Sequence, residues 1–70
     1  MVKKYDINKV NGLNAFAVMS YVTHAMEDCK MSHSEISDYK KDATSDTYDY
    51  LVEVSEFYLN HCNRIAEGRL

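Results

Sequence analysis

Apolar residues recur every three or four positions along most of the chain, a spacing that predicts α-helices. The first helix is expected to start at about Asn14, whose side chain can accept a hydrogen bond from the free backbone N–H groups of the first turn. Its apolar face is broad enough to touch two neighbouring helices and contains Ala15, Phe16, Val18, Met19, Val22, Ala25, Met26 and Cys29. The opposite, polar face contains Ser20, His24, Glu27 and Asp28.

A capping box marks the start of a second, shorter helix, because Ser32 and Glu35 can each satisfy the other's backbone N–H group. This helix is expected from about His33 to Ala43, with a narrow apolar stripe of Ile36, Tyr39 and Ala43. The stretch HAMEDCKMSHSEI, residues 24–36, is therefore interpreted as the joint between two helices.

The third helix is predicted to be the longest. Ser45 or Asp46 can cap its start, Asp49 is favourable in its first turn, and Gly68 offers a stop. Its apolar stripe repeats at spacings of three and four and contains Tyr48, Leu51, Val52, Ser55, Tyr58, Leu59, Cys62 and Ile65.

These elements predict an all-α fold, a compact three-helix domain (long, short, long) over residues 13–70 with an irregular or extended N-terminal arm over residues 1–12. The chain has no proline and only two glycines, which argues against a turn-rich sandwich or barrel. In the arm, Val2, Tyr5, Ile7 and Val10 fit an extended segment or a short helical turn equally well. If the second helix carries the chain back, the first and third helices run roughly parallel, and Cys29 and Cys62 become neighbours.

Composition and charge exclude several classes of function. The 70 residues suffice for one small domain, and no apolar run approaches the roughly 18 to 20 residues of a membrane span. The net charge of −3 and the scattered Lys and Arg residues argue against nucleic acid as a partner. Two cysteines are too few for a secreted disulfide scaffold, so a cytoplasmic protein is expected.

A metal or catalytic site is not expected. Cys29, His33, His61 and Cys62 form a set of the kind that binds zinc, but the first two straddle a predicted helix break. His61 and Cys62 are adjacent on one helix and point about 100° apart. We therefore expect no cofactor, no metal and no catalytic residue, with these four as a weaker alternative site.

Tyrosine is unusually frequent, with six in the chain against two phenylalanines and no tryptophan. One small core cannot hold them all, and tyrosine is enriched at protein interfaces. Together with the acidic ridge of the second and third helices, they indicate an interaction surface. Its candidate residues are Tyr21, Tyr39, Asp42, Asp46, Asp49, Tyr50 and Glu53.

The runs NAFAVMSYVTHAMEDC and EISDYKKDATSDTYDYLVEVSEFYLNHCN, within residues 12–63, resemble small uncharacterised helical proteins of Gram-positive bacteria and their mobile elements. No activity is established for that class, so the resemblance implies a bacterial, phage or plasmid origin and transfers no catalytic residue.

The function we predict is a non-enzymatic, acidic, helical module for protein–protein interaction or regulation, for which a homodimer is also conceivable. Two alternatives stay open. The acidic surface could inhibit or regulate a nucleic-acid-binding protein by imitating the charge of DNA, or Cys29 and Cys62 could serve a small metal-binding or redox protein. Helix-turn-helix DNA binding is disfavoured because the third helix begins with the acidic sequence SDTYDYLVEVSE.

Overall fold

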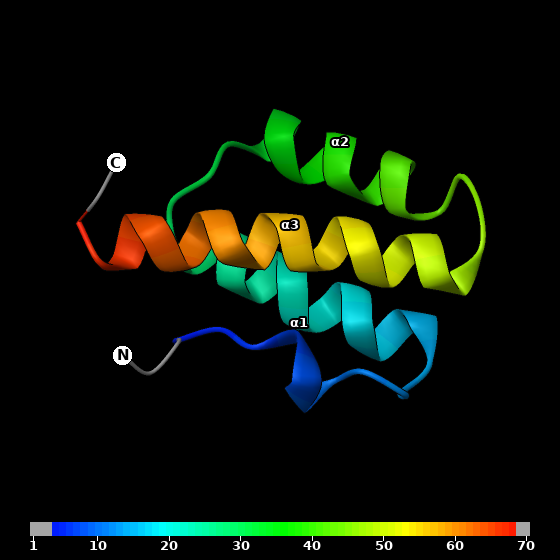
Figure 1. Cartoon of the computed structure of the whole chain (residues 1–70). Coiled ribbons are helices and arrows are strands. Elements are labelled where there is room, and N and C mark those ends of the chain that lie inside the picture. Colours follow the sequence, from blue (N-terminus) through cyan, green and yellow to red (C-terminus); the bar gives the residue numbers. More distant parts are fainter. Residues whose placement is uncertain (1–3, 69–70) are drawn as a thin grey trace.

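The computed structural model describes residues 4–68 and contains three α-helices, which confirms the all-α prediction. The helices are α1 (Ala15–Asp28), α2 (His33–Ala43) and α3 (Tyr48–Ala66), and a short 3-10 helix, η1 (Ile7–Lys9), precedes them. Figure 1 shows α1 and α3 running in the same direction with α2 running back, as expected from the short middle helix. None of the helices in the described part of the chain is long and apolar enough to cross a membrane.

Two of the three predicted helix starts are confirmed. Asn14 accepts a hydrogen bond from the Ala17 backbone N–H at 2.8 Å, and both halves of the capping box between Ser32 and Glu35 are present. The start of α3 was predicted one or two residues too early. Its N-cap is Thr47, whose hydroxyl accepts from the Tyr50 N–H at 3.2 Å.

The error at α3 has a local cause. The Ser45 hydroxyl and N–H both donate to the Asp42 carbonyl, so Ser45 still closes α2 and cannot open α3. Asp46 accepts from the neighbouring Thr47 N–H and reaches no N–H of the helix itself. Thr47 has the extended backbone that an N-cap requires.

The core forms where α3 packs against α1 on one side and α2 on the other. Its fully buried side chains are Val18, Val22, Met26, Tyr39, Ser55, Leu59 and Cys62. The stripe predicted for α2 is confirmed, since Ile36, Tyr39 and Ala43 are all buried. Two buried residues of α3 were not predicted, Val54 and Asn63.

The apolar face of α1 is narrower than predicted. Phe16 is 88% exposed and Ala15 is also exposed, although both belong to the predicted stripe. The reason is that α1 packs mainly on α3 and touches α2 much less, so the side of α1 that carries Phe16 has no neighbour to cover it. On α3, Tyr48 is 38% exposed and Ile65 is half-buried, so both lie at the rim of the core.

The described part of the N-terminal arm packs against α1 and α3. It forms the short turn η1 rather than a strand, with Ile7 and Val10 buried. The Asn63 side chain accepts from the Tyr5 N–H and donates to the Tyr5 carbonyl, each at 2.8 Å. This explains why a polar residue is buried on α3. Val2, the first apolar residue assigned to the arm, lies outside the described residues.

Candidate functional site

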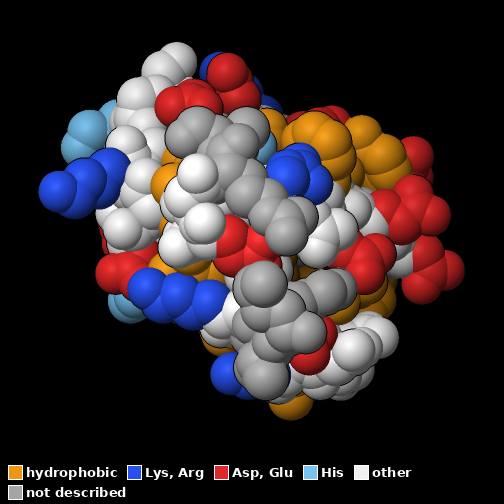
Figure 2. All heavy atoms as spheres, turned by 60° about the vertical axis from the view of Figure 1, so that its left-hand side comes forward, with side chains coloured by type: hydrophobic (Ala, Val, Ile, Leu, Met, Phe, Trp, Pro, Cys, Tyr) orange, Lys and Arg blue, Asp and Glu red, His pale blue; other side chains and the backbone are white. Residues whose placement is uncertain are grey.

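A shallow hollow of about 230 Å³ lies between the end of α2 and the outer face of α3. Asp42 lines it from α2, and the other lining residues come from α3: Tyr50, Glu53, Val54, Phe57 and Tyr58. We call this surface the acidic groove. Figure 2 shows hydrophobic side chains and carboxylates sharing the right-hand edge of the molecule.

Helical spacing explains why α3 contributes so many of these residues. Positions three or four apart share one side of a helix, and Tyr50, Val54, Phe57 and Glu53 follow that spacing. Val54 is buried at the floor of the groove, whereas Phe57 is 64% exposed. One large aromatic ring of the groove is therefore exposed to water.

Aromatic contacts connect this exposed ring to the core. The centroid of the Tyr58 ring lies 5.5 Å from that of Phe57 and 5.2 Å from that of Tyr39, both in edge-to-face geometry. Such pairs are favourable beyond the area that they bury. Because Tyr39 is fully buried, the series anchors the surface aromatics on the rigid interior.

The electrostatics of the groove are strongly negative. The Tyr50 hydroxyl donates to the Asp42 carboxylate at 2.7 Å, and this hydrogen bond, with desolvation and the charges of Asp42, Asp46 and Glu53, raises the pKa of Tyr50. Desolvation raises the pKa of Tyr58, and nearby carboxylates raise it further. The carboxylates whose charges act on the two hydroxyls are Glu35, Asp38, Asp42, Asp46 and Glu53.

These carboxylates are not neutralised within the described chain. Within the described residues 4–68, none of these five carboxylates takes part in a salt bridge. The ion pair found there joins Lys4 to Asp28 at 3.6 Å. A cluster of like charges around an apolar ring destabilises itself slightly and attracts cations. The groove is therefore suited to a ligand that is both basic and apolar.

The structure brings together four of the seven residues predicted for an interaction surface. Tyr50, Asp42 and Glu53 line the acidic groove, and Asp46 lies close enough to influence Tyr50 electrostatically. Asp49 is exposed in the first turn of α3 but does not line the hollow.

The remaining two predicted residues lie elsewhere. Tyr39 was wrongly assigned to the interaction surface, because its side chain is fully buried between α2 and α3. Its hydroxyl shares a 2.7 Å hydrogen bond with that of Ser55, which allows a tyrosine to occupy the core. Tyr21 is half-buried on α1, where its hydroxyl accepts from the Asp6 N–H at 3.1 Å.

Phe57 and Tyr58 belong to the groove, but neither was predicted for it. Tyr58 was assigned to the core stripe, and it is half-buried at the edge of the core. Phe57 lies just outside the stripe of α3. A large aromatic residue off the apolar stripe of an amphipathic helix is the signal that could have identified it.

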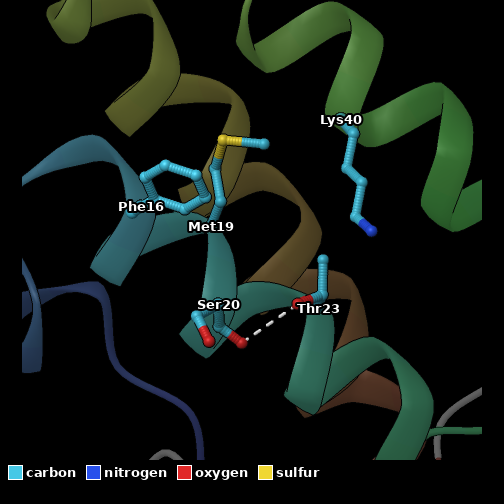
Figure 3. Close-up of a pocket in the computed structure, with 5 residues that line it drawn as sticks. All are labelled: Phe16, Met19, Ser20, Thr23 and Lys40. Atoms are coloured by element: carbon cyan, nitrogen blue, oxygen red, sulfur yellow. Dashed lines mark hydrogen bonds between the residues drawn. The ribbon is translucent and has the colours of Figure 1, made fainter.

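A second hollow, of about 300 Å³, lies between α1 and α2 on another side of the molecule. Figure 3 shows Phe16 and Met19 side by side on α1, Ser20 and Thr23 further along the helix, and Lys40 facing them from α2. The Thr23 hydroxyl donates to the Ser20 carbonyl at 3.1 Å. Lys40 is the only charged residue of this lining, so its character differs from that of the acidic groove.

The predicted proximity of Cys29 and Cys62 is confirmed. The Cys29 thiol donates to the Cys62 carbonyl at 3.5 Å, and both cysteines are free thiols. Burial, followed by a hydrogen bond with the Cys29 thiol, raises the pKa of Cys62 to about 12. Cys62 is therefore a protonated thiol at neutral pH, without the thiolate character of a nucleophile.

The four residues of the alternative zinc site, Cys29, His33, His61 and Cys62, do not all come together in the structure. Over residues 4–68, no three His, Cys, Asp or Glu side chains are arranged to hold a metal ion. His33 is exposed at the first position of α2, and His61 is half-buried on α3. Adjacent positions such as His61 and Cys62 diverge around the helix axis, so only Cys62 points to the core.

No protein family model, curated protein or solved structure matches this chain. The proposals below therefore depend on the geometry and the charge of the surface.

Proposed function

We propose that this protein is a non-enzymatic interaction module whose acidic groove binds a basic, amphipathic segment of a partner protein. The observation that carries the proposal is the environment of Phe57, which is 64% exposed among carboxylates that form no salt bridge within residues 4–68. A large aromatic anchor inside a polar rim is the usual composition of an interface hot spot.

Each part of the groove has a separate role in this recognition. An apolar side chain of the partner would cover Phe57 and exclude water from its ring, while Lys or Arg side chains would pair with Glu53 and Asp42. The hydrogen bond between Tyr50 and Asp42 already orients one carboxylate, which lowers the entropy lost on binding. Binding should therefore weaken with salt but persist through the apolar contact.

A narrower version of this function is inhibition or regulation of a nucleic-acid-binding protein. It is favoured by the carboxylates in and near the groove, of which Asp42 and Glu53 line it, because a surface that binds phosphates could also bind them. In this version the partner's basic segment is its nucleic-acid site, so DNA would compete with this protein. A cytoplasmic location and an origin on a mobile element accompany the proposal as further predictions.

The test is affinity capture from nuclease-treated lysate of the source cell, with identification of the retained proteins by mass spectrometry. The groove variant carries Phe57→Ser and Glu53→Gln. Its matched control carries Phe16→Ser and Glu27→Gln, which also remove one exposed ring and one charge but lie on α1. All four positions are exposed, so both variants should keep the wild-type circular dichroism spectrum.

We expect a protein with a basic segment to be retained by the wild type and the control and lost with the groove variant. A synthetic peptide of that segment should then bind about tenfold or more weaker to the groove variant, and its affinity should fall between 0.05 and 0.5 M salt. Equal retention by all three proteins, or no specific retention by the wild type, would count against the proposal.

A further inference from the structure

Three sulfur-containing residues from two separate parts of the chain lie together where α1 and α3 end. The Cys62 thiol lies 3.9 Å from the Met31 thioether, and the Cys29 thiol lies 3.5 Å from the Cys62 carbonyl. This sulfur cluster, Cys29, Met31 and Cys62, lies away from the residues that line the acidic groove.

The turn after α1 holds two of these sulfur atoms in place. Lys30 adopts a left-handed backbone with φ of 63°, the Met31 N–H donates to the Met26 carbonyl at 2.9 Å, and the Lys30 N–H donates to the Glu27 carbonyl at 3.0 Å. This pair of bonds is a Schellman motif, which reverses the chain at the end of a helix. The reversal carries Met31 back against the core next to Cys62.

The geometry points to a site for a soft monovalent metal ion, Cu(I), bound by the sulfur atoms of Cys29, Met31 and Cys62. Thiolate and thioether ligands favour Cu(I) over harder ions. With metal–sulfur bonds of about 2.3 Å, three sulfurs in a plane around the ion would stand about 4 Å apart. The separation of 3.9 Å between Met31 and Cys62 already matches that spacing.

Burial and access also fit an ion that enters from the surface. Cys62 is fully buried, whereas Cys29 and Met31 are half-buried and can meet the ion first. Binding replaces both thiol protons, so that two thiols and one Cu(I) give a complex with a single negative charge and two released protons. No electron is transferred in this step.

Zinc is a poorer match for the same cluster. Structural zinc sites are almost always tetrahedral with four protein ligands, and here no fourth His, Cys, Asp or Glu side chain completes a site in the described chain. The thioether of Met31 is a soft ligand that zinc seldom uses. Searching the sequence for His and Cys alone therefore missed the third ligand.

The test is anaerobic titration of the fully reduced protein with Cu(I) in the presence of a coloured Cu(I) chelator. We expect the wild type to take one equivalent of Cu(I) per chain, and Met31→Leu to bind about tenfold or more weakly. Met19→Leu is the matched control, since Met19 is another half-buried methionine but lies on α1 facing the second hollow. It should bind like the wild type.

Further variants are titrated in the same way. Cys62→Ala should abolish binding, and if that variant fails to fold, Met31→Leu still tests the site. Equal affinities of wild type and Met31→Leu would overturn the proposal, as would reduced wild type that takes no Cu(I) or binds zinc as tightly as Cu(I). Phe57→Ser should leave Cu(I) binding unchanged, which separates this site from the acidic groove.

Discussion

At the scale of single residues, the pair of Tyr39 and Ser55 shows how a polar group is accommodated in this core. Both side chains are fully buried, and their hydroxyls share a 2.7 Å hydrogen bond. A buried hydroxyl without a partner costs about 1 to 3 kcal/mol, so the serine on α3 is as necessary as the tyrosine on α2. This pairing explains why the polar Ser55 belongs to an apolar stripe.

We expect Ser55→Ala to lower the free energy of unfolding by about 1 to 3 kcal/mol, because it leaves the Tyr39 hydroxyl unpaired. Tyr39→Phe should cost less, since a helical serine can turn its hydroxyl to the carbonyl four residues earlier. Urea denaturation of both single variants and the double variant measures the coupling. Strictly additive losses would show that the two hydroxyls do not support each other.

At the scale of elements, the end of α1 contains a local conflict between sequence and conformation. Lys30 occupies the left-handed position of the Schellman motif, with φ of 63°, where glycine is the usual residue. In the same role after α3, the chain has Gly68, with φ of 75°. The turn after α1 is therefore formed at the expense of backbone strain.

We expect Lys30→Gly to raise the free energy of unfolding by about 0.5 to 1 kcal/mol, because it removes that strain. Lys41→Gly is the matched control, since Lys41 lies within α2, where glycine should instead lower stability by about 1 kcal/mol. Thermal and urea denaturation of the two variants should thus shift in opposite directions. A loss of stability in Lys30→Gly would contradict the interpretation.

At the scale of the whole molecule, the buried and hydrogen-bonded hydroxyls and thiol make folding sensitive to alkali. Burial raises the pKa of Cys62 to about 12 from its ordinary value of 9.0. The pKa values of Tyr5, Tyr39 and Tyr58, raised mainly by desolvation, and of Tyr50, raised mainly by Asp42, also lie above 10.0. The folded state therefore holds these protons more tightly than the unfolded state.

Since each of these groups has a higher pKa when folded, its contribution to stability is complete below the unfolded value and is lost as pH rises. We expect the free energy of unfolding to fall from about pH 9 as Cys62 ionises in the unfolded chain, and more steeply above pH 10. Urea denaturation between pH 7 and 11 measures this. Cys62→Ala should remove the loss that begins near pH 9, and an unchanged profile would contradict this assignment.

Much of the fold could be predicted from the sequence because it depends on neighbours within one helical turn. The bounds of α2 and the caps at Asn14 and Ser32 were predicted correctly from spacing and side-chain chemistry. The start of α3 was not, because three residues with similar capping ability stand in a row and the end of α2 decides between them. Phe16 was misplaced because periodicity identifies a face but not whether another helix covers it.

The residues of the candidate site, too, could be predicted from the sequence only in part. The sequence alone was enough to nominate Tyr50, Asp42 and Glu53, but it placed the buried Tyr39 beside them and omitted the exposed Phe57. Burial of an aromatic residue depends on the partner that it meets, and the partner of Tyr39 lies 16 residues further along the chain. No local signal distinguishes a tyrosine that will find a serine from one that will face water.

The sequence by itself thus determined the helices, the caps of the first two, the order of all three and the acidic character of the second and third. Only the tertiary structure decided which stripes are covered, how Asn63 holds Tyr5 across 58 residues, and how the Met31 thioether comes to lie 3.9 Å from the Cys62 thiol. The physical reason is the separation along the chain between the residues that each interaction joins. Helix formation and capping are governed by hydrogen bonds within a few positions, whereas burial and the meeting of sulfur atoms require segments far apart in the chain to pack together.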